Sequence, residues 1–196
     1  MKKLTVFASG SGTNFQAIID AVEQGELDAT ITGLITSRDQ IGALARANKA
    51  VIPCSVIKPG HYRTEEGFAE ALLEALQSFD PDLIVLAGYT VKIPASVIRK
   101  YAGRILNIHP SLLPRYGGKG FYGMRVHEAV LRAGDKETGC TVHLVDEEYD
   151  RGPILAQRKV PVYNGDSPET LARRVLKQEH QILPLTIQQL LTDQTN

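Results

Sequence analysis

The sequence predicts an α/β protein with an open, Rossmann-like sheet that is mostly parallel, has an antiparallel C-terminal portion and carries helices on both faces. Short apolar runs alternate with longer segments of helical period, which is the pattern of parallel strands joined by crossover helices. A glycine-rich turn at residues 9–14 separates the first apolar run from the first helical segment. After residue 109 the alternation ends, and two strand-like runs in succession indicate an antiparallel pair.

The expected elements follow in chain order from this alternation. Runs of mainly apolar residues predict five strands, at Leu4–Ala8, Thr30–Ile35, Val51–Val56, Leu83–Ala87 and Ile105–Ile108. Between them, apolar residues that recur at helical spacing predict helices at Asn14–Glu23, Gly42–Asn48, Glu65–Ser78 and Pro94–Lys100.

Further elements are expected after His109. A glycine-rich loop leads to a helix at Val126–Ala133, strands at Thr141–Val145 and Ile154–Val162, and a last helix at Pro168–Leu191. The start of the last helix is supported by the Asp-Ser pair before Pro168. That pair supplies a capping side chain, and proline fits the first helical turn.

Length and composition predict a single domain over residues 1–196. Lys plus Arg equals Asp plus Glu at 22 each, so the basic surplus typical of nucleic-acid binding is missing. No apolar stretch approaches the roughly 18 residues of a membrane span. We therefore expect a cytoplasmic protein with small-molecule partners and no nucleic acid or membrane, as a monomer or weak homodimer. Cys54 and Cys140 are expected to be reduced, buried thiols rather than metal ligands.

The turn at residues 9–14, SGSGTN, is a candidate phosphate site. Free backbone N–H groups and the positive end of the helix dipole favour an anion there, and Ser11, Thr13 and Asn14 add side-chain donors that suit a terminal monophosphate. Phe15 stands where a dinucleotide fingerprint has its third glycine, which argues against NAD. The alternative is a tight turn without a ligand.

Asn107 and His109 lie at the expected carboxyl end of the fifth strand, where open α/β sheets bind ligands. Residues two apart in a strand face the same side, so an amide donor and an imidazole can meet one substrate, as acyl transfer requires. A single histidine at a strand end is more often structural, and the spacing alone leaves both interpretations open. The acidic loop at 145–153 can reach such a pocket, but its composition does not say which of its carboxylates takes part.

Three motifs carry a family resemblance: SGSGTN at 9–14, GRILNIHPSLLP at 103–114 and DRGP at 150–153. With this order and spacing, from Lys3 to about Leu190, the chain resembles the folate-dependent glycinamide ribonucleotide transformylases. The resemblance implies transfer of a formyl group from 10-formyltetrahydrofolate to the amine of glycinamide ribonucleotide in de novo purine biosynthesis, without a metal or NAD. It also implies a catalytic trio, in which Asn107 and protonated His109 stabilise the oxyanion and Asp150 pairs with His109 and assists proton movement.

The resemblance implies binding residues as well. Those for the ribotide are Gly12, Thr13, Asn14 and Glu179; those on the folate side are Tyr89, Thr90, Val91, Lys92, Ile93, Asn107, Asp146 and Asp150. The N-terminal half, about 1–100, would then hold the ribotide phosphate, and the C-terminal half, about 101–196, the catalytic and folate groups. Thr141 and His143 match positions near the catalytic centre. From the residues alone, the segment around Glu179 is typical of a solvated helix face, and His143 of a strand histidine satisfied by its neighbours.

Two departures from the family pattern lie on the folate side. The stretch at 87–93 is AGYTVKI where the family has AGFMRIL, so Val91 followed by Lys92 replaces an arginine, and the glycine-rich loop at 115–123 is longer. We predict a mobile lid or an altered rim, with an effect on affinity rather than on reaction type. The nearest alternative is a formyltetrahydrofolate deformylase, which passes the formyl group to water and usually carries a further N-terminal domain. A non-catalytic nucleotide-binding module is a second alternative.

Overall fold

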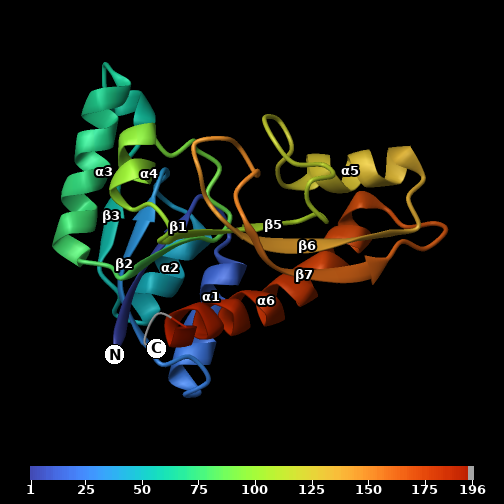
Figure 1. The fold of residues 1–196 in the computed structure, drawn as a ribbon, viewed down its shortest axis with the longest axis horizontal. Helices are drawn as coiled ribbons and strands as arrows, with labels where there is room; N and C mark the ends of the chain where they lie inside the picture. The colour runs from blue at the N-terminus through green and yellow to red at the C-terminus, as the bar shows by residue number, and fades with distance from the viewer. Residues whose placement is uncertain (194–196) are drawn as a thin grey trace.

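A computed structural model describes residues 1–193, which form one seven-stranded sheet flanked by helices (Figure 1). The strand order is β3-β2-β1-β4-β5-β6-β7. The strands are β1 (Lys2–Ala8), β2 (Ala29–Thr36), β3 (Cys54–Val56), β4 (Leu83–Leu86), β5 (Ile105–His109), β6 (Glu137–Leu144) and β7 (Ile154–Pro161). Strands β1 to β5 pair in parallel, and β6 and β7 are antiparallel, so the predicted fold class is confirmed. The last three residues of the predicted domain, 194–196, lie outside the described residues.

Helices cover both faces of the sheet (Figure 1). They are α1 (Thr13–Glu23), α2 (Gly42–Lys49), the short 3₁₀ helix η1 (Pro59–His61), α3 (Glu65–Phe79), α4 (Ala95–Lys100), α5 (Met124–Ala133) and α6 (Pro168–Asp193). Successive residues of β1 divide between the faces, because side chains alternate along a strand. Leu4 and Val6 join the cluster that includes α1, α2 and α6, whereas Phe7 joins the cluster of α3 and α4.

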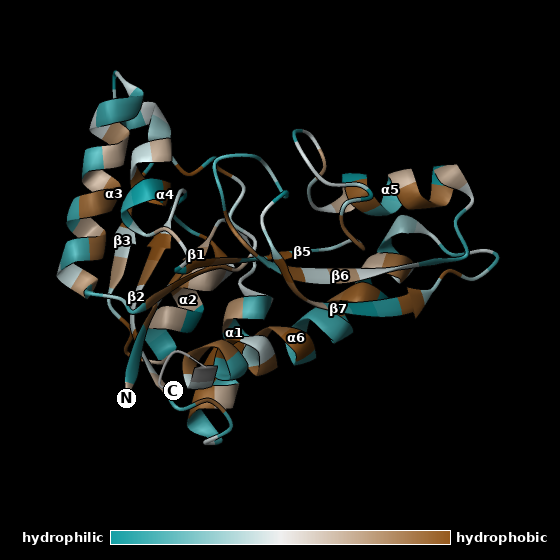
Figure 2. Cartoon of the chain, in the orientation of Figure 1, coloured by the Kyte–Doolittle hydropathy of each residue, from teal (hydrophilic) through white to brown (hydrophobic). Residues whose placement is uncertain are grey.

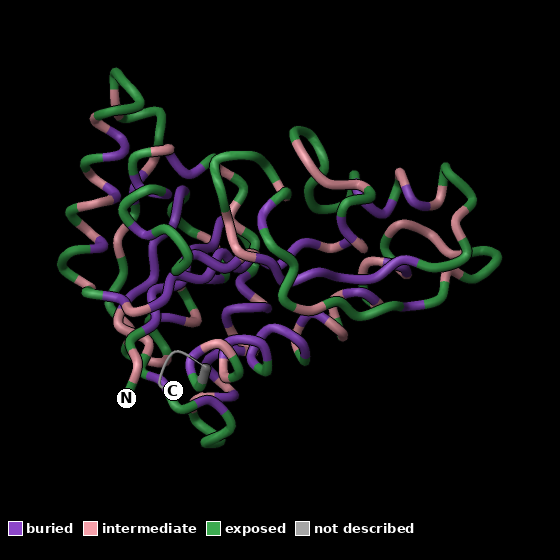
Figure 3. The backbone as a smooth tube through the Cα atoms, viewed as in Figure 1, coloured by how far each residue is buried: buried purple, intermediate pink, exposed green. Residues whose placement is uncertain are grey.

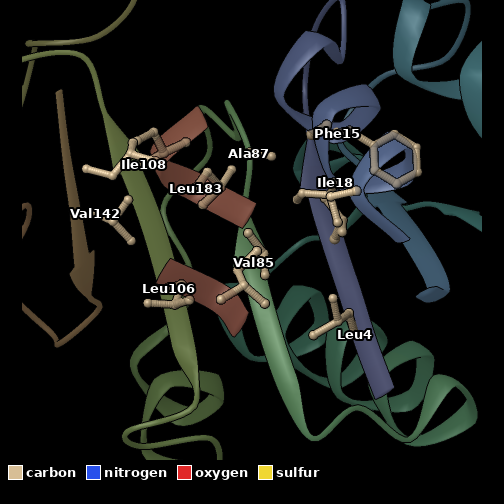
Figure 4. Close-up of a cluster of buried hydrophobic side chains, with 14 of the residues drawn as sticks. Leu4, Phe15, Ile18, Val85, Ala87, Leu106, Ile108, Val142 and Leu183 are labelled. Carbon is tan, nitrogen blue, oxygen red and sulfur yellow. The ribbon is translucent and has the colours of Figure 1, made fainter. Parts of the chain in front are cut away.

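The core runs along the central strands, which are apolar and buried in Figures 2 and 3. All four residues of β4 are buried, as expected for a strand covered by helices on both sides. Figure 4 shows side chains from neighbouring strands, among them Val85, Leu106 and Val142, with Leu183 of α6 packed against them. Among residues 1–193, no helix is long and apolar enough to cross a bilayer.

Three sequence expectations are corrected by the structure. Strand β3 starts at Cys54 rather than at Val51, because Val51 has a positive φ of 57° in the turn after α2 and is 88% exposed. Strand β6 starts at Glu137, four positions earlier than expected, since residues 137–139 pair with the end of β7. The Cys54 thiol is exposed, so the prediction of a buried thiol is wrong there, whereas Cys140 is buried as predicted.

We expect Leu183→Ala to lower the free energy of unfolding by about 2–5 kcal/mol, because it leaves a cavity between α6 and the sheet. Urea denaturation measures this value. Leu185→Ala is the matched control, since Leu185 is on the same helix and 52% exposed, and its loss should be below about 1 kcal/mol. Equal losses in the two variants would contradict the packing described for α6.

Candidate active site

A cavity of about 760 Å³ opens at the carboxyl ends of β1, β4 and β5. The chain leaves β1 toward β2 on one side, while β4 lies on the other, so the strand order reverses between β1 and β4. Such a reversal point is where open α/β sheets bind ligands. The walls come from the loop after β1, residues 86–93, the end of β5, the glycine-rich loop, residues 145–150 and part of α6.

The loop after β1 has the geometry of an anion site. Gly12 begins α1 with a positive φ of 71°, and no side chain caps this end of the helix. A Cβ atom at Gly12 would lie 2.7 Å from the Cα of Ala43, so only glycine lets α2 pack this closely. Phe15, at the place of a third fingerprint glycine, is fully buried in the core. The first turn of α1 therefore offers its N–H groups to the cavity.

Asn14 and Glu179 form a buried polar pair in the cavity wall. The Asn14 Nδ2 atom donates to Glu179 Oε2 at 2.7 Å, which joins α1 to α6. The Asn14 Oδ1 atom has no partner within residues 1–193, so it can accept a hydrogen bond from a ligand. Glu179 is only 6% exposed, so the expectation of a solvated helix face is wrong. Burial raises the pKa of Glu179, and the hydrogen bond from Asn14 offsets part of that rise.

Asn107 and His109 face residues of β6 across the antiparallel pair, with Asn107 opposite His143 and His109 opposite Thr141. His143 Nδ1 lies 2.9 Å from the carbonyl oxygen of Leu144, which only accepts, so Nδ1 carries the proton. The Nε2 atom of His143 then accepts from Asn107 Nδ2 at 3.1 Å. This contact fixes the Asn107 amide with its N–H₂ group inside the site.

Asp150 joins this cluster from the loop between β6 and β7. Its Oδ2 atom accepts from the backbone N–H of Gly118 at 2.8 Å and lies 3.6 Å from His109 Nδ1. Its Oδ1 atom lies 3.4 Å from Asn107 Nδ2 and 3.6 Å from His143 Nε2. Burial raises the pKa of Asp150. The combined effect of His143, His109 and the Gly118 N–H lowers it by more than burial raises it, so the pKa lies below the ordinary value. Asp150 is therefore ionised at neutral pH.

His109 is held at both ring nitrogens. Its Nε2 atom lies 2.8 Å from the carbonyl oxygen of Tyr116, and its Nδ1 atom faces Asp150. Burial lowers the pKa of His109, and the attraction of Asp150 and the Tyr116 carbonyl offsets only part of that effect. The effect of burial on the pKa of His109 is therefore larger than that of the Asp150 carboxylate. The sequence alone could not decide between these two effects.

The residues implied for the folate side also line the cavity. The Tyr89 hydroxyl is buried without a partner in the described part of the chain, and burial raises its pKa. The Thr90 N–H donates to Ser9 Oγ at 3.2 Å, Ile93 is buried, and Lys92 Nζ lies 5.6 Å from the centre of the Tyr149 ring. Val91 is half-buried beside them.

Two further groups lie in the cavity wall, Asp146 and His127. The Asp146 side chain accepts from the Glu148 N–H at 2.9 Å, so it shapes its own loop. His127, which the sequence analysis missed, lines the cavity from α5 and is 4% exposed. Its Nδ1 has no partner in residues 1–193, and burial, with a smaller contribution from His109, lowers its pKa to about 4. Nothing in the sequence around His127, which follows Val126 in an amphipathic helix, indicates that this side chain lines a cavity.

The described residues contain no cluster of three or more His, Cys, Asp or Glu side chains arranged to hold a metal ion. The fold and the site together define an α/β protein equipped for acyl transfer. The loop at residues 9–14, here called the anion loop, meets an amide, an imidazole and a carboxylate at one end of the sheet.

Known proteins are similar to this chain in sequence and in fold. The formyl transferase family model matches residues 2–187, so the chain belongs to the formyl transferase family. The chloroplastic phosphoribosylglycinamide formyltransferase of Vigna unguiculata is 46% identical over 182 residues, which cover 92% of this chain but only 58% of the plant protein. The phosphoribosylglycinamide formyltransferase of Haemophilus influenzae is 43% identical over 187 residues, covering 95% of this chain and 86% of the relative.

Solved structures lead to the same family. The crystal structure of glycinamide ribonucleotide transformylase 1 from Geobacillus kaustophilus has a TM-score of 0.90 and 42% identity, and the match covers 97% of this chain and 98% of that one. A formyltetrahydrofolate deformylase from Pseudomonas syringae has a TM-score of 0.87 but 26% identity, and 62% of it is covered. The deformylase is therefore a more distant relative of this chain than the glycinamide ribonucleotide transformylase is.

We expect Glu179→Gln to be more stable than the wild type at pH 8 and to gain less at pH 5. The pKa of Glu179 is raised in the folded protein, so the folded state binds its proton more tightly, and stability falls as pH rises from the unfolded value through the folded one. Glutamine does not ionise, so the Glu179→Gln variant does not lose stability in this way as the pH rises. Urea denaturation at both pH values measures the difference.

Glu169→Gln, on the exposed first turn of the same helix, is the control and should show no such gain, because the hydrogen bond from Ser167 lowers the pKa of Glu169. A Glu179→Gln variant that is less stable than the wild type at pH 8 would contradict a raised pKa at this position.

Proposed function

We propose that this protein transfers the formyl group of 10-formyltetrahydrofolate to the amine of glycinamide ribonucleotide, giving formylglycinamide ribonucleotide and tetrahydrofolate in purine biosynthesis. The observation that carries the proposal is the meeting of Asn107, His109 and Asp150 within one cavity that also contains an anion loop. Membership of the formyl transferase family and the names of its relatives support it.

The ribotide fits the half of the cavity formed by α1 and α6. Its phosphate would accept hydrogen bonds from the N–H groups at Gly12, Thr13 and Asn14, where the helix dipole favours negative charge. Glu179 and the unpartnered Asn14 Oδ1 supply acceptors for hydroxyl and amine hydrogens. These contacts would direct the amine of the ribotide toward Asn107.

The formyl donor fits the other half of the cavity, near residues 89–93. Ile93 and the neighbouring apolar side chains form a wall for a flat ring, and the buried Tyr89 hydroxyl lacks a partner among residues 1–193. Val91 replaces the family's arginine, so Lys92 is the cation that residues 87–93 offer to the carboxylates of the donor. Asp146 and Asp150 bound this half on the loop after β6.

In the reaction the amine attacks the formyl carbon, and the carbonyl oxygen gains negative charge. The Asn107 N–H₂ group is positioned to donate to that oxygen, since its contact with Asp150 is long at 3.4 Å and easily exchanged. The ring of His109 would stabilise the same charge when it is protonated, a state that Asp150 and the Tyr116 carbonyl favour against the burial that lowers its pKa. The ionised Asp150 accepts the amine proton, directly or through water, and its return to the departing folate nitrogen completes the transfer as the old carbon–nitrogen bond breaks.

Location and assembly remain predictions from the sequence. We infer a cytoplasmic enzyme made of one domain over residues 1–196, acting on small molecules as a monomer or a weak homodimer, with neither metal nor NAD taking part. Sedimentation velocity over a range of protein concentrations measures the oligomeric state.

The proposal is tested by following tetrahydrofolate release from 10-formyltetrahydrofolate with and without glycinamide ribonucleotide. We expect release only with the ribotide, and a fall in kcat of about 10²–10⁴-fold in His109→Ala and about 10²–10³-fold in Asn107→Ala. His61→Ala is the matched control, because His61 is exposed and lies outside the cavity wall. Equal release without ribotide would identify a deformylase, and no release in either case would leave a binding protein.

We also expect Lys92→Ala to raise the KM for the formyl donor about two- to fivefold with little change in kcat. Lys92 is exposed at the rim, and one solvent-exposed charge pair is worth no more than about 1 kcal/mol. Steady-state kinetics at saturating ribotide measure this effect. Lys100→Ala, on α4 away from the cavity, is the control, and a large loss of kcat in Lys92→Ala would place Lys92 in the chemistry instead.

A further inference from the structure

The Tyr116 carbonyl determines where His109 carries its proton. A carbonyl oxygen only accepts, so at 2.8 Å it requires a hydrogen on His109 Nε2. The other nitrogen, Nδ1, then faces the Oδ2 atom of Asp150 at 3.6 Å. Two acceptors face each other there unless Nδ1 also carries a proton. The acceptor on each side of the ring favours the imidazolium and so offsets part of the burial that lowers the pKa of His109.

The Tyr116 backbone needs support to hold this carbonyl in place. Tyr116 has a positive φ of 54°, which a bulky side chain rarely adopts without outside constraint. Its hydroxyl donates to Asp135 Oδ2 at 2.7 Å, and Arg115 Nη2 lies 2.7 Å from the same carboxylate. Ser111 Oγ donates to the Arg115 carbonyl at 2.6 Å. Asp135 directly follows the C-terminal cap of α5, so the loop is tied to that helix.

We propose that Tyr116 is a positioning residue for the formyl transfer: the bond from its hydroxyl to Asp135 fixes its carbonyl, and that carbonyl holds the His109 proton on Nε2 and favours the charged ring. The catalytic part of this inference rests on the proposed function, whereas the effect on His109 does not. Tyr116 acts through its backbone and need not touch the substrate.

The other groups that face His109 come from three elements. Asp150 approaches from the loop after β6 and attracts the charged ring, whereas His143 from β6 opposes it. His127 on α5 interacts electrostatically with His109 as well. None of these groups contacts the Tyr116 hydroxyl, which donates to Asp135. A change confined to that hydroxyl therefore tests the carbonyl without altering the charges around His109.

The same loop also holds Asp150, because the Gly118 N–H donates to it two residues after Tyr116. Gly117 between them is close-packed, and a Cβ atom there would lie 2.5 Å from Leu113 Cδ2 and 3.2 Å from Asp150 Cβ. A shift of Tyr116 is thus transmitted to both partners of the His109–Asp150 contact.

The test is an NMR titration of the His109 ring in the wild type, Tyr116→Phe and Asp135→Ala, with the signal assigned by its absence from His109→Ala. We expect the pKa of His109 to fall by about half a unit or more in both variants, since the charged ring loses its fixed acceptor. Tyr163→Phe is the control: Tyr163 is exposed, and its ring lies under the Arg174 guanidinium as the Tyr116 ring lies under that of Arg115. We expect no change there.

An unchanged His109 pKa in Tyr116→Phe would overturn the inference, as would an equal change in Tyr163→Phe. If Tyr116→Phe does not fold, Asp135→Ala removes the same hydrogen bond, and an unchanged His109 pKa in that variant overturns the inference, because the lost negative charge can only add to the expected fall. In kinetics, we expect kcat of Tyr116→Phe to fall about three- to tenfold with both KM values within twofold. A shifted pKa in a protein without ribotide-dependent transfer would refute the proposed function alone, and a shifted pKa with unchanged kcat would refute the catalytic part of the inference.

Discussion

The architecture of the site depends on one buried negative charge, the carboxylate of Asp150. A buried carboxylate is costly unless its oxygens are paired, and here the partners come from separate parts of the chain. Gly118 donates from the loop after β5, and Asn107 donates from β5 itself, where His143 on β6 holds its amide in place. The antiparallel pairing of β5 and β6 places Asn107 and His143 opposite each other, so the mixed sheet is what lets these groups meet.

Most of the fold could be predicted because its signals are local. Apolar runs mark the central strands, and the Asp-Ser-Pro sequence marks the start of α6, where the structure has it. The errors fall where tertiary structure overrides the pattern. Val51 is apolar but belongs to a turn, and residues 137–140 extend β6 only because β7 pairs with them. Strand β3 lies at the edge of the sheet and has three residues, none of them buried. Its predicted length was therefore too great.

The candidate site was predictable only in part. Asn107 and His109 are two apart at a strand end, and that spacing is visible in the sequence. Asp150 was assigned by resemblance, because Asp146, Glu147 and Glu148 have the same chemistry. Only the fold distinguishes them, since these three are exposed while Asp150 turns inward with a positive φ of 55°. The burial of His127 and the contact of the Tyr116 carbonyl with His109 depend on tertiary packing, and no residue type signals either one.

The hydrogen bond between Asn14 and Glu179 spans 165 positions of the chain, and this separation has a consequence for biosynthesis. The anion loop leaves the ribosome well before the acceptor of the Asn14 amide, which lies 165 positions later in the chain. Until then the amide nitrogen has no acceptor from α6, and that wall of the pocket is missing. A nascent chain that lacks α6 therefore cannot hold a ligand in the geometry described above, and ligand binding follows the synthesis of α6 rather than assisting the folding of the segments before it.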